Sequence, residues 1–161
     1  MKAKKIIKQE IDLDIAKITL LSEEEYEAAK NIIPVRDDRW WLRSPIEFFE
    51  PIATYLVSKV GKLDSSYVPD IYGVRPALKI RNLKSSGLII EDKIELAWHA
   101  WTVISDELAL CDDIVGHTFF REDMKAEDAN NYEKSDIKKW LENWAAENGI
   151  DISVVLTTTW P

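Results

Sequence analysis

Near the C-terminal end of the chain, apolar residues recur with the period of an α-helix. In segment 135–149 they occupy positions i, i+3, i+4, i+7 and i+8, which form one stripe on a helix: Ile137, Trp140, Leu141, Trp144 and Ala145. Ser135 is a typical N-cap and Gly149 a typical C-terminal stop. The pattern predicts an amphipathic helix that buries its stripe, Trp140 and Trp144 included, against a sheet.

A second helix and its preceding strand are predicted near the N-terminus. Segment 11–21 alternates between apolar and polar residues and then changes phase, which is typical of a strand interrupted by a bulge. Ser22 and Glu25 have the spacing of a capping box, so a helix should begin there. Pro34 ends this helix or follows it closely.

The middle of the chain favours β-structure. Segments 39–44 and 72–80 each read as one strand, and Pro76 places the second at an edge or a bulge. Segment 46–72 lacks a clean period, which indicates short strands and loops. Segment 93–111 reads as one hairpin that turns at Ser105–Glu107, with two alternating faces: Ile94, Leu96, Trp98, Ala100 and Ile104 on one, and Ala97, His99, Trp101 and Val103 on the other.

The remaining segments complete an α+β prediction. Residues 112–134 read as a polar loop, and residues 150–156 as a last strand. The expected architecture is a mostly antiparallel sheet with a few packed helices. A chain of 161 residues fits a single domain, 1–161.

Charge and composition narrow the classes of protein. With 21 Lys and Arg against 29 Asp and Glu, the formal net charge is −8, which disfavours direct binding to nucleic acid or to an anionic membrane. It suits a soluble protein, or an acidic face that meets a basic partner. A single cysteine excludes an internal disulfide, and no segment has the length of a membrane span or the pattern of a signal peptide. We therefore expect a cytoplasmic protein.

Motifs for catalysis are scarce. Glycine-rich phosphate cradles and nucleophile elbows are absent from the sequence. The two histidines, His99 and His117, have no partner at ligand spacing, so no metal and no cofactor are expected. A nucleophilic Cys111 paired with either histidine is the least favoured alternative, because a lone cysteine is usually a small buried apolar residue. The chain is accordingly expected not to be an enzyme.

The run "RWWLRSP" (39–45) pairs two tryptophans with two arginines. Trp40 and Trp41 are neighbours on a strand and so point to opposite faces, which requires cover on both sides. Arg43 and Arg75 lie among apolar strand residues, where arginines usually bond internally. We expect all four to be structural residues.

Two motifs together resemble a known family. "WWLRSP" (40–45) followed by "GVRPALKI" (73–80) is similar to the paired signature of poorly characterised domains found in gut Firmicutes and their phages. "LLSEEEY" (20–26) resembles its upstream element, and "WTVISDELALC" (101–111) with "YEKSDIKKWLENW" (132–144) resembles its other half. In the family the second half often comes first, so the halves here, 1–88 and 89–161, have the order of a circular permutation. Ile46 also stands where the family commonly has glycine.

The resemblance extends to C-type-lectin-like and formylglycine-generating-enzyme-like domains, and implies a C-type-lectin-like fold. It carries over no oxidase activity, which needs reactive cysteines in the matching strands. Nor does it carry over calcium-dependent sugar binding, since "EPI" (50–52) lacks the amide ligand of that motif. Variable proteins of diversity-generating retroelements bracket a hypervariable stretch with the same two motifs. The bracketed insert here is 46–72.

The favoured hypothesis is a non-catalytic binding domain of phage or mobile-element origin with a protein ligand. The insert would supply its ligand-binding residues: Glu47, Phe48, Phe49, Thr54, Tyr55, Tyr67, Asp70 and Tyr72. The alternative is a small acidic phage inhibitor of a host nucleic-acid enzyme, of the anti-defence type. Its nucleic-acid-mimicking face would contain Glu122, Asp123, Glu127, Asp128, Glu133 and Asp136.

Overall fold

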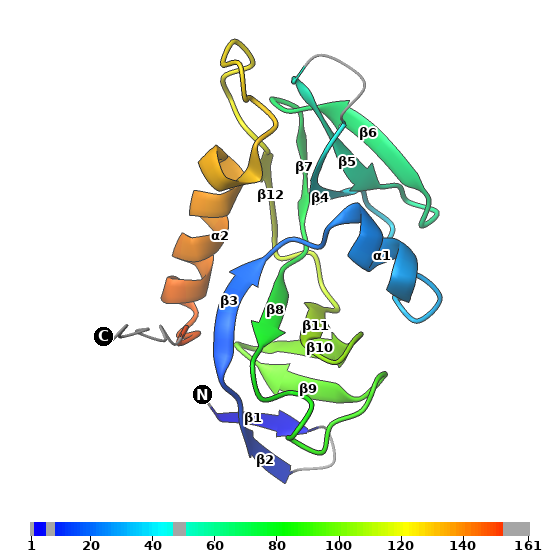
Figure 1. Cartoon of the computed structure of the whole chain (residues 1–161), viewed down its shortest axis with the longest axis vertical. Helices are drawn as coiled ribbons and strands as arrows, with labels where there is room; N and C mark the ends of the chain where they lie inside the picture. The colour runs from blue at the N-terminus through cyan, green and yellow to red at the C-terminus, as the bar shows by residue number, and fades with distance from the viewer. Residues whose placement is uncertain (1, 6–8, 47–50, 153–161) are drawn as a thin grey trace, which may run out of the picture.

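Two β-sheets and two α-helices make up the computed structural model, which describes residues 2–5, 9–46 and 51–152 (Figure 1). The lower sheet in Figure 1 has the strand order β2 (Gln9–Asp12), β1 (Lys2–Lys5), β9 (Lys93–Leu96), β10 (His99–Val103), β11 (Leu108–Cys111), β8 (Ala77–Ile80) and β3 (Ile15–Thr19). The upper sheet has the order β12 (Gly116–Phe119), β7 (Ile71–Val74), β4 (Trp40–Pro45), β5 (Ala53–Val57) and β6 (Leu63–Tyr67). Helices α1 (Glu23–Ala29) and α2 (Asp136–Glu147) flank the sheets, and a 3₁₀ turn (Tyr132–Lys134) precedes α2.

The predicted α+β class is confirmed. Strand pairing is antiparallel except between β4 and β7, which run parallel. The two sequence halves are interleaved: β1 pairs with β9, β8 with β11, and β7 with β12. Neither 1–88 nor 89–161 therefore completes a sheet by itself. Among the described residues, no helix is long and apolar enough to cross a bilayer.

Both helices begin as the sequence predicts. The Ser22 hydroxyl accepts from the Glu25 amide at 3.0 Å, and the Glu25 carboxylate accepts from the Ser22 amide at 2.8 Å, which completes the capping box. At α2, the Ser135 hydroxyl accepts from the Lys138 amide at 3.1 Å. Gly149 has a φ of 69°, the left-handed conformation that ends many helices.

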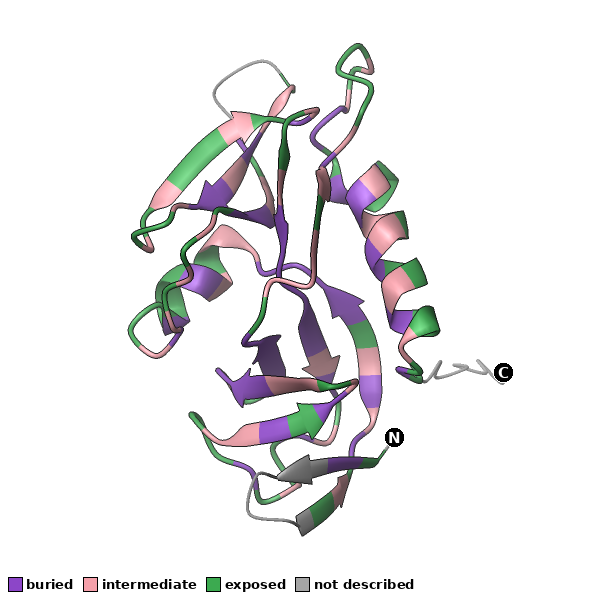
Figure 2. Ribbon diagram, turned by 180° about the vertical axis from the view of Figure 1, so that it is seen from behind, coloured by how far each residue is buried: buried purple, intermediate pink, exposed green. Residues whose placement is uncertain are grey.

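The apolar stripe of α2 faces the core, but its tryptophans are only half-buried. Ile137, Leu141 and Ala145 are buried, whereas Trp140 and Trp144 pack against the edge of the same core (Figure 2). Trp140 lies over β12 so closely that a Cβ on Gly116 would come within 2.6 Å of its ring. The expectation that both tryptophans are buried was wrong: each lies beside the buried Ile137, Leu141 and Ala145 at the margin of the stripe and stays partly in water.

Several segments differ from their sequence-based predictions. Segment 72–80 is two strands in different sheets, β7 and β8, separated by Arg75–Pro76. Segment 11–21 contains the end of β2 and all of β3, and the pairing of β3 with β8 shifts register between Ile15 and Lys17, where the bulge was expected. Segment 112–134 contains β12, which was predicted as loop. The expected strand 150–156 lies mostly outside the described residues.

Segment 93–111 forms three strands instead of one hairpin. An additional turn at Ala97–Trp98 joins β9 to β10, and the predicted turn at Ser105–Glu107 joins β10 to β11. The extra turn changes the phase of every later residue, so Trp101 is buried and Trp98 is 95% exposed. The predicted faces were wrong after Leu96 because no glycine or asparagine marks the turn.

Arg75 ties the two sheets together at the point where the chain passes from one to the other. Its Nε donates to the Cys111 carbonyl of β11 at 2.8 Å, and its Nη1 donates to the Pro34 carbonyl at 3.1 Å. The guanidinium lies 4.9 Å from the centre of the Trp40 ring on β4, a cation–π distance. Burial lowers the pKa of Arg75 to about 10, so it remains charged at neutral pH. The prediction of an internal structural role is confirmed.

We predict that Arg75→Met lowers the free energy of unfolding by roughly 2–4 kcal/mol, because two backbone carbonyls lose a charged donor in a dry site. Arg75→Lys should lose nearly as much, since an ammonium lacks the planar fork. Exposed Arg39 provides the control, and Arg39→Met should change stability little. Denaturant unfolding measures all three; equal stability of Arg75→Met and wild type would contradict the role assigned to Arg75.

A second prediction concerns α2. Leu141→Ala should lower the free energy of unfolding by about 2–5 kcal/mol, because Leu141 is fully buried. Trp144→Ala should lower it by roughly half of the ~3–5 kcal/mol typical of a fully buried tryptophan, since its ring is partly in water. Thermal and chemical unfolding of both variants would check this ranking, and a larger loss at Trp144 would reverse it.

Candidate functional site

The two motif strands lie side by side in the upper sheet. Trp40 on β4 is in parallel register with Gly73 on β7, and the Gly73 amide donates to the Arg39 carbonyl at 2.8 Å. A Cβ on Gly73 would lie 2.8 Å from that carbonyl oxygen, so glycine is required for this close approach. The two motif strands are therefore neighbours in one sheet, and the insert between them starts from the end of β4 and returns at the start of β7.

Both tryptophans of the motif are buried, on opposite faces of β4. Trp40 lies in a core beneath α1, where its ring meets the Tyr26 ring edge-on at 5.6 Å. Trp41 lies in the larger core, between Tyr72 and Phe120 at 5.1 and 5.7 Å, and its indole NH donates to the Thr118 carbonyl at 3.0 Å. The cover predicted for the second tryptophan is therefore supplied by α1, and β4 has a buried tryptophan on each face.

Arg43 fastens the end of β4 to α1. Its Nη1 donates to the Leu20 carbonyl at 2.6 Å and to the Glu25 carboxylate at 2.5 Å. Burial by itself would raise the pKa of Glu25, but the bonds from Arg43 and from the Ser22 amide outweigh it and lower that pKa. The predicted internal pairing of Arg43 is confirmed.

The insert is more regular than its sequence indicates. Residues 53–67 form a β-hairpin, β5–β6, in continuous register from Ala53–Tyr67 to Val57–Leu63. β5 pairs with β4 on its other side, so the hairpin extends the upper sheet and β6 is its edge strand (Figure 1). Residues 47–50 of the insert lie outside the described part of the chain.

One face of the hairpin presents two tyrosines to solvent. Tyr55 is directly opposite Ser65, and Tyr67 is two residues further along β6, so the two tyrosines are diagonal neighbours on one face. Tyr67 is 57% exposed and Tyr55 is half-buried against the core beneath α1. We call Tyr55, Ser65 and Tyr67 the tyrosine face.

On the opposite side of the hairpin, Ser66, the exposed Asp70 and the half-buried Tyr72 form a hydrogen-bonded polar cluster. Ser66 donates to the Asp70 carboxylate at 2.7 Å, and its hydroxyl lies 3.0 Å from the Tyr72 hydroxyl. Tyr72 also packs against Trp41, and Thr54, opposite Ser66, is fully buried. Thr54 is therefore not on the ligand-accessible surface, and the prediction that placed it there is corrected: strand alternation turns it inward. The predicted residues Glu47, Phe48 and Phe49 lie outside the described residues.

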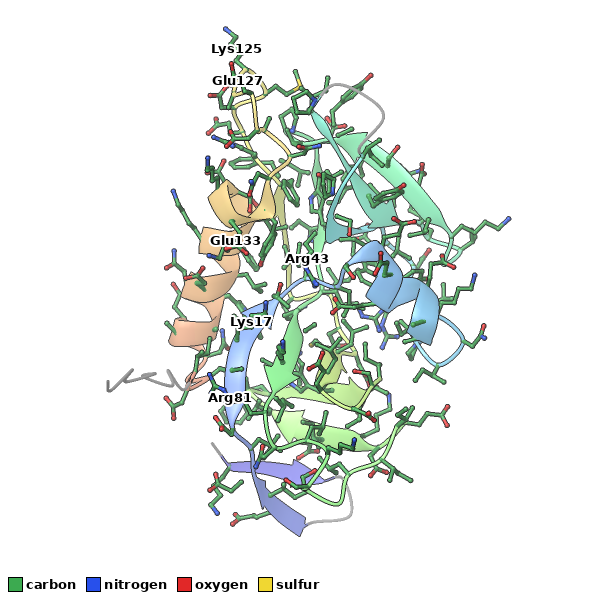
Figure 3. All side chains as sticks on the ribbon, in the orientation of Figure 1. Lys17, Arg43, Arg81, Lys125, Glu127 and Glu133 are labelled. Carbon is green, nitrogen blue, oxygen red and sulfur yellow. The ribbon has the colours of Figure 1, made fainter. Side chains whose placement is uncertain are left out.

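The acidic residues of the alternative hypothesis do not form one free face. Asp128 accepts from Arg121 at 3.3 Å and from Lys134 at 2.7 Å, and Glu133 accepts from Lys138 at 2.9 Å. The carboxylate of Asp136 caps the Glu122 amide, and that of Asp123 caps the Lys125 amide. Figure 3 shows Glu127 beside Lys125 at the far end of the loop, well away from Glu133, which lies toward Arg43. Neighbouring cations thus offset part of this charge.

Among the described residues, the thiol of Cys111 makes no hydrogen bond to either histidine. Cys111 is fully buried, and burial raises the pKa of its thiol to about 12, so it is not a thiolate at neutral pH. His99 contacts Asp113 at 2.9 Å and His117 contacts Asp38 at 2.5 Å, so each imidazole has a carboxylate partner other than the thiol. Asp112 is held by Lys93 and Thr102. Within the described part of the chain, no group of three or more His, Cys, Asp or Glu side chains is placed to hold a metal ion.

The Glu25–Arg43 pair predicts a dependence of stability on pH. Because folding lowers the pKa of Glu25 below its ordinary 4.5, its contribution is fully present above pH 4.5 and is lost as the pH falls through the folded-state value. Glu25→Gln should therefore destabilise the protein at pH 7 and differ less from wild type near pH 3. Urea unfolding at both pH values, with exposed Glu24→Gln as the control, measures this; a difference that does not shrink in acid would contradict it.

Comparison with known proteins links this site to one family model. Residues 5–82, just under half of the chain, match the model described as a domain of unknown function, DUF6273. No curated protein and no solved structure matches the chain. The matched range includes both motif strands and the insert, and it ends just after β8, although β8 takes β11 as a sheet partner from outside that range. The match therefore covers the element that carries the tyrosine face and leaves out strands on which the lower sheet depends.

Proposed function

We propose that this protein is a non-catalytic binding domain with a C-type-lectin-like arrangement, and that the β5–β6 hairpin of its insert contacts a protein ligand. The observation that supports this most directly is the tyrosine face, which lies on two strands that are hydrogen-bonded into the upper sheet. The phage or mobile-element origin and the link to diversity-generating retroelements remain part of the proposal, and they rest on the two bracketing motifs.

The scaffold favours recognition by a fixed surface. Trp40 and Trp41 hold β4 in two separate cores, and Arg43 fixes its end to α1. β5 is hydrogen-bonded between β4 and β6, so a ligand on the hairpin meets side chains that are already ordered. Preorganisation of this kind lowers the entropy lost on binding.

The chemistry of the tyrosine face favours a protein partner. Tyrosine supplies a large, amphipathic contact area with few rotatable bonds, which is why it dominates many binding surfaces. Ser65, directly opposite Tyr55 and two residues before Tyr67, adds a small, adaptable hydrogen-bonding group. The edge of β6 also offers backbone groups to an incoming strand. Together these groups suit a peptide or a flat protein surface.

We expect Tyr55→Ala combined with Tyr67→Ala to weaken the specific partner by at least ~10-fold, because central aromatic anchors carry much of the energy of an interface. Wild type and the double variant are each used as bait in lysate of the host cell. A protein that wild type enriches more than the variant is then purified, and its affinity for both is measured by calorimetric titration. Ile89→Ser with Ile90→Ser, which alters two other exposed apolar residues, is the matched control and should leave the affinity unchanged.

The same titration separates the proposal from the acidic inhibitor. Binding through the tyrosine face should change little between low and physiological salt, whereas binding through carboxylates should weaken steeply as salt rises. Affinity that survives the double tyrosine variant but is lost on Glu122→Gln, Asp123→Asn and Glu127→Gln would reject the tyrosine face in favour of the inhibitor hypothesis.

A further inference from the structure

The turn between β9 and β10 has an unfavourable backbone for its residues. His99 pairs with Leu96, so Ala97 and Trp98 alone connect the two strands. Their φ angles are 53° and 67°, the left-handed region at both positions. Two-residue hairpin turns with this geometry normally use asparagine and glycine, because a Cβ is strained there. The chain instead places an alanine and a tryptophan in this turn.

Trp98 is also the most exposed large apolar residue in the described chain. It is 95% exposed, whereas Trp40, Trp41 and Trp101 are 1% exposed or less. An indole in water and a strained turn both oppose the stability of an isolated molecule. Trp98 is therefore unfavourable for two independent reasons. This suggests that its side chain contacts a partner that is absent from the isolated chain.

A hollow lies directly beside the indole. It has a volume of about 560 Å³, and its lining includes Lys2, Glu95, Leu96, Ala100 and Asn148. One wall is held in place, because His99 contacts the Asp113 carboxylate at 2.9 Å and packs against the Trp144 ring at 5.9 Å. The lining offers apolar surface for an indole ring and polar groups for its NH.

We propose that the occupant of this hollow is Trp98 of a second copy of this chain, in a two-fold symmetric dimer. A protrusion and a hollow on one patch are self-complementary, because a two-fold rotation brings each against its counterpart. The hollow carries both signs of charge, Lys2 and Glu95, so a two-fold arrangement can set Lys2 of one copy against Glu95 of the other at two equivalent places. A partner other than a second copy would need to match only the exposed indole or only the hollow, whereas a second copy matches both.

The dimer would leave the proposed ligand surface open. The β9–β10 hairpin belongs to the lower sheet and the β5–β6 hairpin to the upper sheet, at opposite ends of the molecule (Figure 1). Each dimer would therefore carry two tyrosine faces. The inference itself does not rest on the proposed function, since it follows from the turn, the indole and the hollow.

Sedimentation equilibrium on the full chain, from about 1 to about 500 µM, tests the dimer. Wild type should associate with concentration, and Trp98→Gly should weaken association at least ~10-fold. Because glycine accepts a positive φ, the same variant should raise the unfolding midpoint of the monomer, measured at the low end of this concentration range, by roughly 2–4 °C. Ile90→Ser, at an exposed residue outside the hollow, is the control and should dimerise as wild type.

Charge exchange tests the symmetry. Lys2→Glu and Glu95→Lys should each weaken self-association, and mixing the two variants should restore it as a heterodimer, since every facing pair is then opposite in charge. A wild type that stays monomeric across that concentration range would overturn the proposal. So would a finding that residues 153–161, or a different protein, cover Trp98. Equal association of Trp98→Gly, or no restoration on mixing, would do the same.

Discussion

A buried guanidinium at the crossing between two sheets is the constraint on which this structure depends. The chain runs from β7 in the upper sheet to β8 in the lower one through Arg75 and Pro76. Arg75 bonds to the lower sheet at Cys111, to the segment after α1 at Pro34, and stacks on Trp40 of the upper sheet. A buried cation must keep such partners because its desolvation is expensive. These contacts join the two sheets at the point where the chain crosses between them.

Two surface hairpins follow from this frame. β5–β6 extends the upper sheet beside strands that carry Trp40 and Trp41, and β9–β10 lies within the lower sheet beside Trp101. Each hairpin shows an aromatic side chain to solvent, while the strand that it adjoins on one side, β4 or β11, is buried over half or all of its length. Surfaces that project from rigid sheets in this way are suited to recognition, because the scaffold has already ordered the side chains that make contact.

Local signals in the sequence predicted local structure well. Capping residues located both helices, the spacing of Ile137 and Leu141 identified the buried face of α2, and the apolar surroundings of Arg43 and Arg75 predicted internal bonds. Each of these depends on residues a few positions apart or on the chemistry of one side chain. The division of residues 72–80 between two sheets was missed, since an apolar run with a proline has the same pattern in either arrangement.

The sequence by itself determined the class of fold, the two helices and the bracketing of the insert by two motifs. Tertiary structure alone decided that the brackets are neighbouring strands, that Thr54 turns inward and Tyr67 outward, and that Trp98 is exposed and Trp101 buried. The reason is the period of a strand: one unmarked turn or one shift of register reverses which side chains face the core. Only pairing with strands distant in sequence selects between the two phases.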